Sequence, residues 1–192
     1  MAFMLLPASD SRFHLAPVER RHAVLFCFVL LTASCGLASF ALACATPFAA
    51  FAVVAAALLP RRSALLVVIG SWLVNQTIGF GVLRYPINES TIAWGFVIGG
   101  AALAATIASS AVFSAFSAGR APFVFGFALV CAYGAYELLL FAATPFLGGG
   151  GAFHMAIVAR IGLLNIAWMI GLIITCEFVR LGTLFRRSHT TF

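Results

Sequence analysis

The stretch AVLFCFVLLTASCGLASFALACATPFAAFAVVAAALL, from Ala23 to Leu59, contains no charged residue and decides the fold. It is too long for one membrane helix, because about 20 residues suffice to cross the ~30 Å hydrocarbon core. Pro47 divides it, since proline interrupts a helix interior. The two parts, Ala23–Ala45 and Phe48–Leu59, predict a full span and a shorter segment that is tilted, embedded in protein or only partly spanning.

The composition of the whole chain agrees with a membrane location. The 192 residues are 64% hydrophobic and only 8% charged, which is too little charge to cover a soluble domain of this size. All eleven basic residues are arginines, and they stand singly or in pairs between apolar runs. This pattern indicates orientation in a lipid bilayer rather than nucleic-acid binding.

Further apolar runs complete an all-α, polytopic membrane protein with six transmembrane helices, the second of them short. We expect a cytoplasmic N-terminal segment at 1–22, the six-helix domain at 23–181 and a cytoplasmic C-terminal tail at 182–192. The four remaining spans are predicted at Ser63–Leu83, Thr91–Phe116, Ala121–Ala143 and Ala156–Leu181.

The distribution of arginine supports six spans with both termini in the cytoplasm. In that arrangement the outer loops receive only Arg84, in agreement with the positive-inside rule. The inner side receives Arg12, Arg20, Arg21, Arg61, Arg62, Arg120, Arg180, Arg186 and Arg187.

The five cysteines lie inside apolar runs and show no CxxC or Cys/His spacing. We interpret them as small buried apolar residues. The motif ALACA, at 41–45, resembles a signal-peptidase site. The run before it exceeds the usual h-region of about 7–15 residues, so the first span is expected to be retained.

Polar residues converge on the outer half of the predicted bundle. The stretch SWLVNQTIGFGVLRYP, from Ser71 to Pro86, carries two adjacent amides inside a membrane helix, and other spans add ionisable and aromatic groups at similar depth. Such groups usually face the bundle interior or a cavity. The candidate substrate-binding residues are Asn75, Gln76, Phe80, Arg84, Tyr85, Trp94, Tyr133, Glu137, Arg160 and Asn165.

Two of these assignments leave alternatives open. Glu137 and Arg160 have opposite charge and matched depth, so they form either a structural ion pair or the border of a ligand cavity. Asn75 and Gln76 either contact a polar ligand or hydrogen-bond between helices. We expect five residues to line one outer cavity: Asn75, Gln76, Tyr85, Tyr133 and Arg160.

No residue pattern indicates catalysis, so we expect a protein that is not an enzyme. His154 is the one histidine between the terminal regions, and no GxSxG or HExxH motif accompanies it. Small residues at four-residue spacing, such as Gly95/Gly99 and Ser34/Ala38, allow close helix packing. They serve either packing within the chain or docking of a partner subunit.

Six spans, a short second span and a polar outer region resemble the membrane-embedded S components of energy-coupling factor (ECF) vitamin transporters. Within that group, VNQTIGFGVLRYP, at 74–86, followed by TIAWG, at 91–95, is similar to the solitary BtuM-like cobalamin-uptake proteins of proteobacteria. The resemblance is best from Ser63 to about Ser110. It implies a multi-pass protein of the bacterial inner membrane with no cofactor of its own.

The resemblance further implies cobalamin as the transported ligand, with ECF transmembrane and ATPase subunits as partners. Some of these proteins ligate cobalt with a cysteine of the third span; this span has none, and Phe80 lies in the corresponding stretch. His154 or Cys44 are the alternative axial ligands. Two other functions stay open: a transporter or channel for another small solute, and a non-transporting membrane scaffold or assembly protein.

Overall fold

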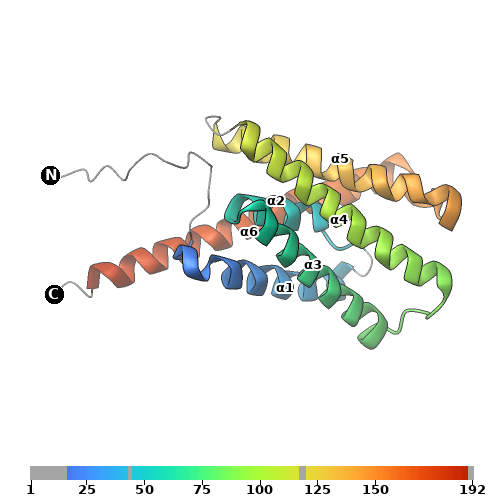
Figure 1. Cartoon of the computed structure of the whole chain (residues 1–192), viewed down its shortest axis with the longest axis horizontal. Coiled ribbons are helices and arrows are strands. Elements are labelled where there is room, and N and C mark those ends of the chain that lie inside the picture. The colour runs from blue at the N-terminus through green and yellow to red at the C-terminus, as the bar shows by residue number, and fades with distance from the viewer. Residues whose placement is uncertain (1–16, 43–44, 117–119, 190–192) are drawn as a thin grey trace.

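The computed structural model describes residues 17–42, 45–116 and 120–189, and these form helices joined by short connections, with no strand (Figure 1). The described part opens with a 3₁₀ turn, Arg20–His22, and a further 3₁₀ turn, Gly150–Phe153, precedes the last helix. The helices are α1 (Ala23–Leu42), α2 (Phe48–Leu58), α3 (Arg61–Thr77, continued by the π-helix Ile78–Val82), α4 (Glu89–Ala115), α5 (Ala121–Leu147) and α6 (Met155–His189).

Five of these helices are long and apolar enough to cross a membrane, and α2 is the exception. With 11 residues, α2 is about 16 Å long, roughly half the thickness of a hydrocarbon core. The all-helical, polytopic architecture and the short second helix are therefore confirmed. The α6 helix extends to His189, into the expected tail at 182–192.

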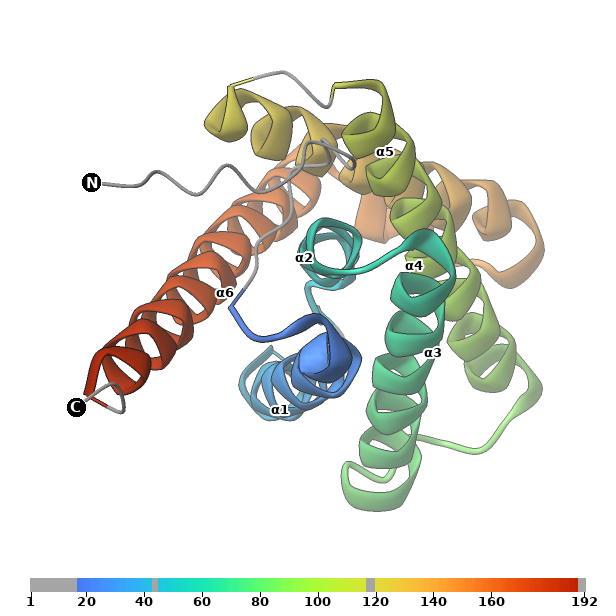
Figure 2. The same cartoon turned by 60° about the vertical axis from the view of Figure 1, so that its left-hand side comes forward.

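The short helix α2 forms the centre of the bundle. In Figure 2 it lies in the middle of the view, with α1 below it, α3 and α4 on one side, α6 on the other and α5 above. All eleven of its residues are buried. A helix that is apolar all round is stable only when other helices enclose it, and its many alanines let five neighbours approach closely.

Local chemistry sets the ends of the helices. Pro60 precedes α3, and Asn88 caps α4 by accepting a hydrogen bond of 2.8 Å from the Thr91 amide. The α5 helix ends where Gly148 and Gly149 adopt positive φ angles of 79° and 90°, a conformation that favours glycine.

A side chain from α6 completes the buried N-terminus of α2. Pro47 stands at the N-cap and has no side-chain acceptor to offer. The Ala50 amide instead donates to Asn165 Oδ1 at 3.0 Å, and Asn165 Nδ2 donates to the Ile161 carbonyl at 3.0 Å. Asn165 is only 2% exposed. It therefore satisfies a helix-end amide that water cannot reach.

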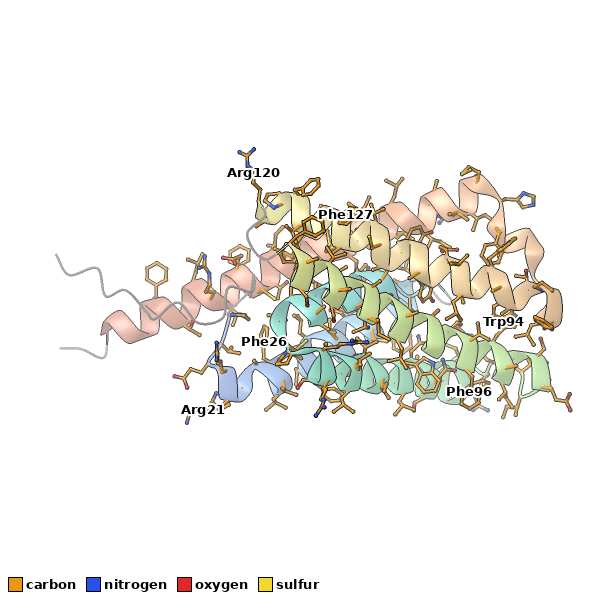
Figure 3. The ribbon with its side chains drawn as sticks, turned by 45° about the horizontal axis from the view of Figure 1, so that its top comes forward. Arg21, Phe26, Trp94, Phe96, Arg120 and Phe127 are labelled. Carbon is orange, nitrogen blue, oxygen red and sulfur yellow. The ribbon has the colours of Figure 1, made fainter. Side chains whose placement is uncertain are left out.

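The helix ends show that α1 begins and α6 ends at the same end of the molecule (Figure 1). In Figure 3, Arg21 and Arg120 lie at that end, while Trp94 lies near the opposite one. We name these the inner end and the outer end, after the expected orientation. Arg12 lies outside the described residues.

The stripes of small residues serve packing within the chain. Ser34 and Ala38 of α1 are buried, as are Gly95 and Gly99 of α4. A methyl group added at Gly99 would lie 2.7 Å from the Trp72 ring, so α3 and α4 approach as closely as glycine permits. The alternative of partner docking is not needed to explain these residues.

Candidate functional site

A cavity of about 240 Å³ lies toward the outer end of the bundle. It is partly open to the surface and is bordered by the connection before α2, by α4, α5 and α6, and by the turn between α5 and α6. The lining residues on which the site depends are Thr46, Trp94, Tyr136, Glu137, Gly149, Phe153 and Ile161.

The walls of the cavity are mainly aromatic and aliphatic, and Glu137 is the one charged residue among the described residues that line it. Tyr136 stacks on Phe48 with ring centroids 6.5 Å apart, and Phe153 meets Phe141 edge-on at 5.3 Å. The aromatic walls are therefore held in place by neighbouring rings.

The turn between α5 and α6 closes one side of the cavity. Gly149 has a φ of 90°, and a methyl group added there would lie 3.5 Å from Cζ2 of Trp94. The glycine run at 148–151 thus includes part of the wall. The sequence does not predict that this run lies close to Trp94, because the two are far apart along the chain.

The side chains of Asn75 and Gln76 contact other groups of the protein. Asn75 Nδ2 donates to Ser39 Oγ at 2.9 Å and to Thr46 Oγ1 at 3.0 Å, which joins α3 to α1 and to the connection before α2. Gln76 Nε2 lies 3.4 Å from Asn75 Oδ1, and its Oε1 packs against Gly95. Asn75 therefore forms the hydrogen bonds between helices that one alternative predicts, whereas Gln76 bonds to Asn75 on its own helix. Asn75 positions Thr46 at the edge of the cavity.

Three further candidates lie in and after the π-helix at the outer end of α3. The Tyr85 ring lies over Gly79, where an added methyl group would be 2.8 Å away, and it meets Phe80 edge-on at 6.3 Å. Arg84 is exposed and adopts a φ of 58°, which is uncommon for a residue with a side chain. None of these three is among the residues that line the cavity.

The expected ion pair between Glu137 and Arg160 is not formed. Arg160 is exposed on α6, and the ion pairs of the described residues are Arg21–Glu19 and Arg180–Glu177. Depth along the helices is matched, but the rotation of α6 directs Ile161 rather than Arg160 to the cavity. The Tyr133 hydroxyl donates to the Val158 carbonyl at 2.7 Å, and the Tyr133 side chain also interacts with the neighbouring Glu137 carboxyl.

The ten candidates thus divide into two groups. Trp94 and Glu137 line the outer cavity, whereas the others do not, so the expected lining by Asn75, Gln76, Tyr85, Tyr133 and Arg160 is corrected. Asn75, Gln76 and Asn165 make hydrogen bonds instead, because a buried amide without a partner is costly.

The proposed cobalt ligands are also placed away from the cavity or outside the described residues. His154 is exposed, and its carbonyl begins α6 by accepting from the amides of Ile157 at 2.9 Å and Val158 at 3.1 Å. Cys44 lies outside the described residues. Among the described residues, no three His, Cys, Asp or Glu side chains gather as a metal site.

Two other cavities have different character. A groove of about 330 Å³ between α3 and α4 is apolar throughout and includes Val68, Trp72 and Phe96. A cavity of about 110 Å³ at the inner end includes Arg61, Ser110 and Ser114. The outer cavity alone among these three combines aromatic walls with a charged group at membrane depth.

Asn75→Leu is expected to lower the free energy of unfolding by about 1 kcal/mol, because it removes two hydrogen bonds worth ~0.6 kcal/mol each in membranes. The melting temperature in detergent should fall by roughly 2–4 °C. Thr77→Val is the control, since the exposed Thr77 hydroxyl bonds only within its own helix, to the Leu73 carbonyl. Equal melting temperatures for the two variants would refute the structural role of Asn75.

Comparison of the chain with protein-family models, curated proteins and solved structures finds no match. The resemblance to vitamin-uptake proteins therefore rests on the sequence alone.

Proposed function

We propose that this chain is a multi-pass membrane protein that binds a small organic solute in the outer cavity and takes part in its uptake. One observation carries the proposal: a cavity of about 240 Å³ with aromatic walls and a carboxylate lies within the outer half of the bundle. An ionisable residue at membrane depth is expensive and usually marks a functional site. Apolar cavities with a few polar groups are the usual form of small-molecule sites.

The size of the cavity favours a small ligand. At the packing density of protein interiors, about 0.75, its volume accommodates roughly ten non-hydrogen atoms. A corrinoid is many times larger than this cavity, which is partly open to the surface, so only part of a corrinoid would fit inside it. Cobalamin is the second candidate, favoured by the sequence at 74–95, with ECF transmembrane and ATPase subunits as the partners that this candidate implies.

Ligand that copurifies with the protein tests the proposal. Ala152→Trp fills the cavity from an exposed lining position, and Ala156→Trp places the same side chain at an exposed site of α6 that does not line it. Mass spectrometry of extracts should find a compound in the parent and in Ala156→Trp that is lost from Ala152→Trp. A compound retained equally by all three proteins, or found in none, would contradict binding in this cavity; corrin absorbance would favour the second candidate.

We also propose that both ends of the chain are cytoplasmic, in a bacterial inner membrane. The clustering of Arg21 and Arg120 at one end of the molecule supports this orientation (Figure 3). Reporter fusions after Arg120 and after Phe192 should both report the cytoplasm. Opposite locations for the two reporters would refute an even number of crossings.

A further inference from the structure

We propose that the ligand of the outer cavity is a small organic cation, held by the Glu137 carboxylate and by the rings of Trp94, Tyr136 and Phe153. This inference rests on the proposed function, because it assigns a chemical class to the ligand of the same cavity.

The charge of the cavity favours a cation. Glu137 is the one charged group among its described lining residues, and the ion pairs of the described residues lie elsewhere, at Arg21–Glu19 and Arg180–Glu177. A carboxylate at membrane depth is costly until a positive charge or several hydrogen bonds compensate it. A cationic ligand supplies that charge when it binds.

The walls of the cavity favour an organic cation over a metal ion. Trp94, Tyr136 and Phe153 line it, and a cation over the face of such rings is attracted by their quadrupoles. Tyr136 and Phe153 are packed against Phe48 and Phe141, so the rings need little ordering when a ligand enters. A metal ion would instead need three or more strong oxygen, nitrogen or sulfur ligands, whereas the described lining offers one carboxylate and the hydroxyls of Thr46 and Tyr136, with no histidine or cysteine.

The N-terminus of α2 lies beside the cavity, and free backbone amides at a helix N-terminus would attract an anion. Here, protein oxygens already accept hydrogen bonds from amides at this helix end. The Phe48 amide donates to the Thr46 carbonyl at 2.8 Å, and the Ala50 amide donates to Asn165 Oδ1 at 3.0 Å. The Phe51 amide donates to the Pro47 carbonyl at 3.2 Å. With these amides occupied, the Glu137 carboxyl is the group of the lining that favours a charged ligand, and it favours a cation.

Calorimetry with an isosteric pair of probes tests the class of ligand. Choline and 3,3-dimethylbutan-1-ol have nearly the same shape, but only choline carries a charge. Full-length protein in lipid nanodiscs should bind choline at least about tenfold more tightly than the neutral alcohol. Glu137→Gln should strongly reduce this preference, with affinity for the alcohol unchanged. Glu89→Gln, at an exposed acidic residue of the α4 N-terminus, is the matched control and should keep the preference.

Trp94→Leu provides a second variant that keeps the carboxylate and should weaken choline binding more than alcohol binding. Equal affinity for both probes, or no binding of choline at millimolar concentration, would overturn the cation assignment. The copurification experiment separates the two failures: a neutral or anionic compound lost from Ala152→Trp would leave the proposed function standing and the cation assignment wrong.

Discussion

Replacement of Phe51 by alanine is expected to lower the free energy of unfolding by about 3–5 kcal/mol, the range for deletion of a large buried ring. Phe51 is fully buried in α2 and meets Phe48 edge-on, with ring centroids 5.8 Å apart. The helices packed on all sides of α2 restrict collapse around the vacated space. The loss therefore includes a large cavity contribution as well as lost dispersion contacts.

Reversible unfolding in mixed micelles measures this loss. Phe178→Ala is the control, because Phe178 lies on α6 and is 70% exposed. This substitution should change the free energy of unfolding by less than about 0.5 kcal/mol. If Phe51→Ala were as mild as Phe178→Ala, α2 would not be the packed centre of the bundle.

Gly99→Ala is expected to lower the free energy of unfolding by about 1–3 kcal/mol, because the added methyl group overpacks the contact between α3 and α4. The added methyl group would lie 2.7 Å from Cε2 of the Trp72 ring. That ring cannot move aside freely, because its Nε1 donates to the Gly95 carbonyl at 2.9 Å. The helices must separate or the hydrogen bond must break.

The matched control is Gly134→Ala on α5, where an added methyl group would have no atom within 4 Å. There the same change should be neutral or stabilising, by up to about 1 kcal/mol, since alanine favours helix more than glycine does. Combining Gly99→Ala with Trp72→Leu should recover part of the loss. If Gly99→Ala and Gly134→Ala melted at the same temperature, the close approach of α3 and α4 would be refuted.

Much of the helix order follows from the sequence, because prolines and charges mark the boundaries. Pro47 and Pro60 delimit α2, and Asn88 begins α4. The enclosure of α2 by protein could be predicted only as one of three alternatives, beside a tilted and a partly spanning segment. A uniformly apolar segment has no polar face, so its pattern does not distinguish a helix enclosed by protein from one that faces lipid.

The sequence predicts how deep in the membrane the candidate side chains lie, but not which way they point around their helix axes. Counting residues along each span places Glu137 and Arg160 at one level, yet Glu137 lines the cavity and Arg160 is exposed. Side chains one position apart on a helix point about 100° apart, and the apolar surroundings of Arg160 give no cue to its rotation. The role of Asn165 in completing α2 was likewise hidden, because Ala50 is distant in sequence.

The most direct test of the account is the rate at which Ala152→Cys, added to the wall of the outer cavity, reacts with charged thiol reagents applied outside intact cells. Among the described native cysteines, Cys27, Cys35 and Cys176 are buried and Cys131 is half-buried, so the parent protein serves as the blank. If the cavity opens to the outer face and attracts cations, trimethylammonium-ethyl methanethiosulfonate should react faster than its sulfonate counterpart. The ratio of the two reaction rates at Ala152→Cys should exceed the same ratio measured on a free thiol in solution by at least about tenfold. Glu137→Gln should abolish this excess. Absence of labelling from outside, or equal relative rates for the two reagents, would contradict an outward-facing site governed by Glu137.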